Sequence, residues 1–204
     1  MYSSNPYAQA GWYNPENPMS INSRTLNAAY VPSVFGALPA VDSSSEGRLL
    51  TFNMGLNNPD ILNCSICGPT GTPYIEITSD YNSAPCTFFR KRDGTVLAHI
   101  EWTTRPMVSI PGIVNKQPIS QWLTLSIDRR SRMMVSRDKP FTWVPKDNQI
   151  ALFANEPAFR DPLATISRIR NLVTLKLSTE AVTAGLLESC IVATVLLQSG
   201  RNID

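Results

Sequence analysis

The stretch AVTAGLLESCIVATVLL, residues 181–197, decides the fold of this 204-residue chain. It carries one charge, Glu188, and its few polar residues point in several directions around a helical axis. Ser178 is suited to cap a helix, and Gly200 lies where a helix can stop. These signals predict a helix over residues 179–198 that is apolar on most sides, and such a helix lies inside a protein or inside a membrane.

A membrane span is the weaker of these two alternatives. The 17 apolar-rich residues are at the lower limit for a span, and an acid near the middle costs on the order of 3 kcal/mol, which offsets several Leu or Val residues. Basic residues also lie on both sides of the segment, at Arg168, Arg170, Lys176 and Arg201. We therefore expect a helix that is surrounded by its own protein.

Short alternating segments fill residues 49–177. In TVLAHIEW, one face collects Val96, Ala98, Ile100 and Trp102, and LLTFNM, YIEIT, WLTLSI and LVTLKL alternate similarly. Turn signals such as NNPD, GPTGTP, RDGT and RDKP separate these segments. At roughly one strand per 10 to 12 residues, this part of the chain holds about a dozen strands.

The fold class predicted from this pattern is all-β: a closed antiparallel barrel of about twelve strands that encloses the hydrophobic C-terminal helix. An eight-stranded barrel has room only for side chains, whereas a helix is about 10 to 12 Å across, so a barrel around a helix needs more strands. Residues 49–204 are predicted to form this domain. Residues 1–48, rich in Asn, Pro, Ser and Tyr, are predicted to be an extension that does not fold alone.

Four stretches carry a resemblance to a known fold: TPYIEITSD, CTFFRKRDGTVLAHIEW, RDKPFTWVPKDNQIALF and LESCIVATVLL. Over residues 49–198 the chain resembles a family of fungal, chiefly mushroom, domains related to the tubby C-terminal fold, which LURP-one-related proteins and phospholipid scramblases share. The resemblance implies a tubby-like barrel, and tubby domains hold phosphoinositide head groups with basic residues. Asp138, Lys139 and Pro140 depart from the Asp-Gly turn of that pattern, and the sequence lacks the cysteine-rich segment and acidic calcium loop of scramblases.

Basic residues between positions 86 and 146 are the strongest binding signal. Eleven Lys or Arg stand against four acids there, a surplus of seven in a chain whose formal net charge is only +2. We expect these clusters at hairpin ends that converge on one rim and attract phosphates or an anionic membrane, although strand ends also carry Lys and Arg for solubility. The predicted ligand-binding residues are Arg90, Lys91, Arg92, Arg129, Arg130, Arg132, Arg137, Lys139 and, as a surface aromatic opposite Leu123, Leu125 and Ile127, Trp122.

Other candidates for chemistry are weaker. His99, the sole histidine, shares a strand face with Glu101; such a pair could act as base and orienting carboxylate, but an ordinary exposed pair is the preferred interpretation. Cys64 and Cys67 form CSIC, yet a structural zinc site needs four ligands, and positions i and i+3 of a strand face opposite sides. We predict no catalytic residue, no metal site and no cofactor. Cys190 is predicted to be a core residue of the final helix.

The predicted function is a non-catalytic binding module for anionic lipid head groups or a protein partner. A cytosolic glycan-binding (lectin-like) or defence protein is the alternative, and a hydrolase or nuclease that uses His99 and Glu101 ranks lower. The N-terminal stretch has no basic region followed by an apolar run, so we expect a cytoplasmic location, peripheral at membranes, with reduced cysteines. So small a net charge does not indicate a specific nucleic-acid partner.

Overall fold

The computed structural model describes residues 49–56, 60–82, 85–155 and 161–204. The predicted extension, residues 1–48, lies outside the described residues. Within the described ranges the elements in chain order are β1 (Leu50–Gly55), β2 (Cys64–Cys67), β3 (Pro73–Asp80), β4 (Cys86–Lys91), β5 (Val96–Glu101), β6 (Met107–Ile110), β7 (Val114–Pro118), α1 (Ile119–Trp122), β8 (Leu123–Leu125), β9 (Arg132–Ser136), β10 (Lys139–Lys146), β11 (Gln149–Ala154), β12 (Ala164–Ile169), β13 (Leu172–Leu177), α2 (Thr179–Thr183) and α3 (Leu187–Gln198).

The strands form one antiparallel sheet of 13 strands, in the order β7-β6-β5-β4-β3-β2-β1-β13-β12-β11-β10-β9-β8. Most neighbours in this order are also neighbours in sequence, as short turns between alternating segments predict. The exception is β1, which pairs with β13 and sets Phe52 opposite Leu175 and Met54 opposite Val173. All four side chains are buried. The pairing therefore joins the first and last described strands, and their core-facing side chains pack next to one another across it.

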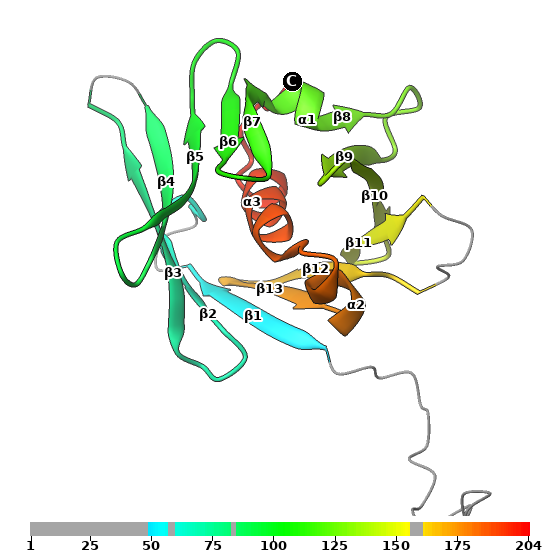
Figure 1. Cartoon of the computed structure of the whole chain (residues 1–204), viewed down its shortest axis with the longest axis horizontal. Helices are drawn as coiled ribbons and strands as arrows, with labels where there is room; N and C mark the ends of the chain where they lie inside the picture. Colours follow the sequence, from blue (N-terminus) through cyan, green and yellow to red (C-terminus); the bar gives the residue numbers. More distant parts are fainter. Residues whose placement is uncertain (1–48, 57–59, 83–84, 156–160) are drawn as a thin grey trace, which may run out of the picture. The chain divides into compact units, whose positions relative to one another are not determined.

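Helix α3 lies at the centre, with the strands arranged around it (Figure 1). Eight consecutive residues, 189–196, are buried, so the helix has no solvent-exposed face along this length. The prediction of a helix inside its own protein is therefore confirmed. Glu188 is half-buried in the first turn, where the positive end of the helix favours a carboxylate. None of the helices in the described ranges is long and apolar enough to cross a membrane.

The helix predicted over residues 179–198 is in fact two helices. Ser178 caps α2 as expected, because its Oγ accepts a hydrogen bond from Ala181 N at 3.1 Å. The chain then turns at Gly185, which has a φ of +70°. A β-carbon at that position would lie 2.7 Å from Arg137 Nε, so glycine fits both the backbone angle and the space, and the helix breaks there.

The sheet is not closed, so the prediction of a closed barrel is wrong. Its two end strands, β7 and β8, form no ladder with each other. They are consecutive in the chain, and the four-residue helix α1 connects them. Pro118 at the end of β7 has no N–H to donate, and Ile119 N donates to Pro106 O at 2.9 Å, so the backbone curls into α1 instead of continuing a ladder.

Candidate functional site

Antiparallel pairing sends alternate turns to opposite ends of the strands and so defines two rims. The lower rim, where α3 begins, holds the β2–β3, β4–β5, β6–β7 and β9–β10 turns. The upper rim, where α3 ends, holds the β8–β9, β10–β11 and β12–β13 turns and, on its other side, the ends of β1, β3 and β5. Because β4 and β9 run in the same direction, residues 90–92 and 137–139 lie at the lower rim and residues 129–132 at the upper rim. The expectation that all these clusters converge on one rim is therefore wrong.

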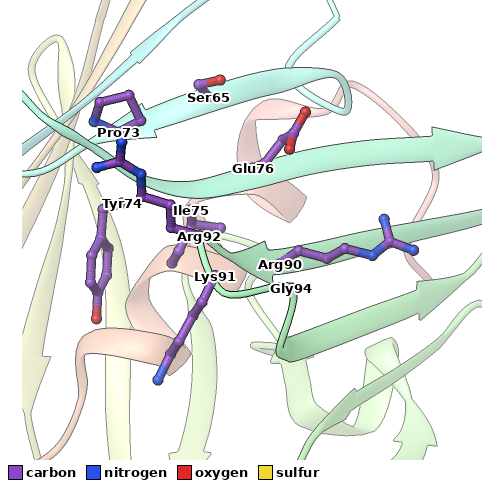
Figure 2. A pocket seen from close by; sticks show the side chains of 9 residues that line it. All are labelled: Ser65, Pro73, Tyr74, Ile75, Glu76, Arg90, Lys91, Arg92 and Gly94. Atoms are coloured by element: carbon purple, nitrogen blue, oxygen red, sulfur yellow. The ribbon is translucent and has the colours of Figure 1, made fainter.

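A pocket of about 350 Å³ lies beside the β4–β5 turn at the lower rim (Figure 2). The strand register places Ser65, Glu76 and Arg90 in one row across β2, β3 and β4. Figure 2 shows that the side chains of Arg90, Lys91 and Arg92 extend in different directions, so they do not converge on one point. The pocket is lined by Ser65, Pro73, Tyr74, Ile75, Glu76, Arg90, Lys91, Arg92 and Gly94.

Arg90 is held by its neighbours on the outer face of the sheet. Its Nη1 donates a hydrogen bond to Thr78 Oγ1 at 2.6 Å, and its guanidinium lies 4.6 Å from the centre of the Phe88 ring, a cation–π distance. Lys91 and Arg92 form no side-chain hydrogen bond or ion pair with any residue that the structure describes. Two of the three predicted residues in this cluster are therefore available to a ligand.

Arg137 and Lys139 belong to the β9–β10 turn of the lower rim. Ser136 pairs with Lys139, which leaves Arg137 and Asp138 as the two central turn residues, with φ of 50° and 62°. Two positive φ angles are the geometry of a tight hairpin turn, reached here without an Asp-Gly pair. Arg137 Nε also lies 3.5 Å from Gly185 O, so this arginine supports the junction between α2 and α3.

A second pocket, of about 130 Å³, lies at the upper rim between the β8–β9 turn and the end of α3. Here the structure brings together three of the predicted residues, Arg129, Arg130 and Arg132. Its wall is mostly apolar, and its basic side chains all come from the turn and the start of β9. The lining residues are Leu125, Arg129, Arg130, Ser131, Arg132, Trp143, Pro145, Ile150 and Leu197.

Arg132 binds a carboxylate of the chain itself. Its Nη1 and Nη2 donate to Oδ1 and Oδ2 of Asp204 at 2.9 and 2.6 Å, and Nη1 also donates to Leu123 O at 2.9 Å. The hydrogen bonds from Arg132, followed by the charges of Arg132 and Arg129, lower the pKa of Asp204. Arginine recognises carboxylates and phosphates with this two-point geometry.

Two turns of the upper rim expose an isoleucine beside arginines. Ile127, in the β8–β9 turn, is fully exposed, and two arginines follow it after one residue. Ile169, at the end of β12, is 71% exposed and lies between Arg168 and Arg170. Neither residue was predicted as a binding residue from the sequence. Alternation placed Ile127 on the inward face with Leu123 and Leu125. The signal that identifies them is an isoleucine next to arginines at a predicted turn.

Arg129 and Arg170 have left-handed backbone conformations, with φ of 56° and 51°. Glycine or asparagine adopts this conformation at lower cost. Neither guanidinium forms an ion pair with a residue in the described ranges. Both positions thus hold an arginine where the backbone favours another residue type, and the charge of Arg129 acts on the Asp204 carboxylate.

Trp122 is buried, so its prediction as a surface aromatic is wrong. Only 1% of this residue is exposed, and its Nε1 donates to Val135 O at 2.9 Å. Residues 119–122 form α1 instead of the start of a strand, so two-residue alternation does not apply to them. Trp102, predicted to be core, is buried, and its Nε1 donates to Thr87 Oγ1 at 2.8 Å.

His99 and Glu101 share the outer face of β5 as predicted, with Nε2 and Oε1 3.5 Å apart. Lys116 Nζ lies closer to the same oxygen, at 2.6 Å, and its hydrogen bond is the main reason that the pKa of Glu101 is lowered. Cys86 faces Glu101 across the ladder, and burial and the Glu101 charge raise the pKa of its thiol. This arrangement keeps the carboxylate ionised and the thiol protonated, which does not activate Cys86 as a nucleophile.

The four cysteines are free thiols. Cys190 is fully buried in α3, and Cys64 is buried on β2 while Cys67 is half-buried. Among the described residues, no group of three or more His, Cys, Asp or Glu side chains is placed to hold a metal ion.

Together these features define a domain in which a single antiparallel sheet surrounds an apolar helix and carries basic pockets at both rims. A family model matches residues 58–203, and the chain belongs to that family, DUF6593, a family of unknown function. No curated protein matches the chain. Among solved structures it is similar to a protein from Arabidopsis thaliana, with 15% sequence identity and a TM-score of 0.36 over 70% of this chain and 91% of that chain.

Proposed function

We propose that this domain is a non-catalytic module that docks on anionic lipid surfaces through its upper rim. The observation that carries the proposal is the pair of exposed isoleucines, Ile127 and Ile169, each beside arginines at the same end of the sheet. Ile127 follows the end of β8 and Ile169 ends β12, and these strands are four positions apart in the sheet, so the two residues are about 19 Å apart along the sheet at roughly 4.8 Å per strand. Apolar side chains flanked by basic ones suit the boundary between acyl chains and anionic head groups.

The charge of the upper rim supports this proposal. On the side of the upper rim that holds Ile127 and Ile169, the β8–β9, β10–β11 and β12–β13 turns, with the strand ends beside them, carry five basic residues against two acids, not counting Arg132, which is paired with Asp204. One of these acids, Asp128, is used within its turn, where its carboxylate accepts from Ser126 Oγ and Arg130 N. At about 1 kcal/mol per basic residue near an anionic surface, the surplus of three contributes about 3 kcal/mol, and burial of each isoleucine adds up to about 1.5–3 kcal/mol. The basic residues are Arg129, Arg130, Lys146, Arg168 and Arg170, and the acids are Asp128 and Asp147.

Co-sedimentation with phosphatidylserine vesicles tests the proposal with a control that is matched in charge. Arg129→Ala with Arg130→Ala removes two positive charges from the upper rim, and Lys91→Ala with Arg92→Ala removes two from the lower rim. We expect the native protein to pellet at low salt and much less at high salt, because screening weakens the attraction. The upper-rim variant should bind at least tenfold more weakly, and the lower-rim variant should bind as the native protein does. Equal losses in both variants would contradict docking through the upper rim.

The tubby-like relationship belongs to the same proposal. An antiparallel sheet around a C-terminal apolar helix supports it, as do the four stretches that resemble the fungal domains. The relationship favours phosphoinositides among anionic lipids and a peripheral location on the cytoplasmic face of a membrane. Vesicles that contain phosphatidylinositol 4-phosphate, compared with phosphatidylserine vesicles of equal charge, measure that preference.

A second candidate function, binding of a glycan, is favoured by the lower-rim pocket. Its volume of about 350 Å³ is in the range of small-molecule sites, and it combines the Tyr74 ring with the Glu76 carboxylate and the Arg92 guanidinium. Glycan binding predicts little dependence on salt, competition by a free sugar, and loss of binding in Glu76→Gln. A glycan array probed at high salt separates this function from lipid docking, which high salt suppresses.

A further inference from the structure

We infer that the upper-rim pocket is a binding site for one phosphate monoester group and that Asp204 competes with this ligand. The inference deepens the proposed function and rests on it for the choice of this rim as the surface that faces anions. It names the chemical group that the pocket takes. It is carried by an unpaired indole N–H, by the carboxylate that Arg132 already holds, and by the volume of the pocket.

Trp143 forms part of the wall of this pocket, is 1% exposed, and has no acceptor for its Nε1–H among the described residues. The other two buried tryptophans differ, because Trp102 donates to Thr87 Oγ1 and Trp122 to Val135 O. A buried donor without an acceptor is unfavourable to the fold. Because Trp143 and the three arginines line the same pocket, we assign this unpaired N–H as a donor to an oxygen of a bound anion.

Arg132 shows which chemistry the pocket recognises. Both of its terminal nitrogens are occupied by the Asp204 carboxylate, at 2.9 and 2.6 Å. The Arg129 charge also acts on this carboxylate. Asp204 thus stands where an anionic ligand would engage Arg132. A phosphate dianion has one more charge and one more terminal oxygen than a carboxylate, so it can replace Asp204 on Arg132 and also engage Arg129 and Arg130.

The size of the pocket limits the ligand to a small group. Its volume of about 130 Å³ holds several water molecules, or a phosphate with its ester oxygen, but is well below the roughly 300–1,000 Å³ of pockets that enclose whole metabolites. The remainder of the ligand must therefore lie outside the pocket. A lipid head group or a soluble phosphate monoester both meet this condition.

Calorimetric titration with glycerol 3-phosphate tests the site in solution. We expect millimolar binding to the native protein, about tenfold weaker binding to Trp143→Phe and about fivefold tighter binding to Asp204→Asn, since a charge-assisted hydrogen bond or the removal of a competing charge changes affinity on this scale. Trp143→Phe should retain or gain thermal stability, because it removes an unpaired donor. Trp122→Phe is the matched control: it should lose stability, because Val135 O loses its donor, and keep native affinity. Equal affinity of Trp143→Phe and the native protein, or weaker binding to Asp204→Asn, would overturn the inference.

Vesicle binding separates this inference from the proposed function. Phosphatidic acid carries a phosphate monoester and phosphatidylserine does not, so vesicles of these two lipids at equal surface charge form the two arms. If the inference holds, Trp143→Phe weakens binding to phosphatidic acid and leaves binding to phosphatidylserine unchanged, and Asp204→Asn strengthens binding to phosphatidic acid more than to phosphatidylserine, because the loss of its charge alone acts on both lipids alike. If the protein binds vesicles but calorimetry detects no binding of glycerol 3-phosphate, the phosphate site is overturned and surface docking is left intact. If glycerol 3-phosphate binds but the protein does not bind vesicles, the site is supported and the docking is contradicted.

Discussion

The hydroxyls of Ser136 and Ser189 lie 2.8 Å apart inside the core, one at the end of β9 and the other in the first turns of α3. Both residues are almost completely buried. Their hydrogen bond fixes the beginning of the central helix against the lower rim of the sheet. A small polar pair at this point lets helix and strand approach closely and satisfies both hydroxyls.

Ser189→Ala should lower the free energy of unfolding by about 1–2 kcal/mol, because it leaves the Ser136 hydroxyl buried without a partner. The double variant Ser136→Ala with Ser189→Ala should lose less than the sum of the two single losses, because no unpaired hydroxyl remains. Urea denaturation of the four proteins in the cycle measures this coupling. Additive losses would show that the two hydroxyls act independently.

The central helix could be predicted because it is apolar in every direction, and only a surrounding protein or a membrane tolerates such a helix. The break at Gly185 could not be predicted, because it depends on a positive φ and on the Arg137 side chain, which comes from a distant turn. The missing ladder between β7 and β8 could not be predicted either. A helical turn over residues 119–122 ends the alternation that a closed sheet requires, and local pattern gave no sign of it.

Arg129→Gly and Arg170→Gly should keep or raise stability while they weaken binding to anionic vesicles. Both positions have positive φ, so glycine relieves backbone strain of about 1 kcal/mol, partly offset by the greater freedom of glycine in the unfolded chain. Thermal unfolding and vesicle sedimentation give the two readouts. Arg130→Gly is the control, because it removes the same charge from the same turn at a position without positive φ; it should weaken binding and also lower stability slightly. A loss of stability in Arg129→Gly comparable to that in Arg130→Gly would remove the argument from backbone strain.

Thiol reactivity should follow burial. Burial, with a smaller contribution from Asp60, raises the pKa of Cys64 to about 12, and burial also raises that of Cys190. Iodoacetamide at pH 8 should therefore modify Cys67 and Cys86 in the native protein and reach the other two cysteines only after unfolding. Mass spectrometry of peptides over a time course measures the order. Modification of Cys190 as fast as Cys67 would show that the central helix is not enclosed.

Acid should loosen the contact between Asp204 and Arg132. The pKa of Asp204 is lowered in the folded protein, so its ion pair contributes stability above the ordinary carboxyl pKa of about 4 and loses it as pH falls through the lowered value. The pair is partly exposed, so its contribution is about 0.2–1 kcal/mol. As the pH falls from about 5 to about 2, a carboxyl group with a lowered pKa gains its proton. Over this range, hydrogen exchange of residues 201–204 should accelerate in the native protein beyond the intrinsic pH effect. Asp204→Asn should show no such additional change, and an identical profile for the two proteins would contradict the assignment.

Only part of the candidate site could be predicted from the sequence. The surplus of basic residues identified Arg129, Arg130 and Arg132, which the structure brings together in one pocket. The separation of the clusters depends on strand direction over the whole sheet, since β4 and β9 run in the same direction but residues 90–92 lie at the end of β4 and residues 129–132 at the start of β9. The unpaired N–H of Trp143 is a property of its packed surroundings, and no local pattern reports it.

The most direct test of docking through the upper rim is the environment of a tryptophan placed at its exposed tip. The emission of Ile127→Trp, taken as the difference from the native spectrum, should shift to shorter wavelength when phosphatidylserine vesicles are added at low salt, because the indole enters the interface. Val96→Trp, at an exposed position of the lower rim, is the control and should show no shift. A shift in Val96→Trp with none in Ile127→Trp, or vesicle binding without a shift at Ile127, would contradict the account.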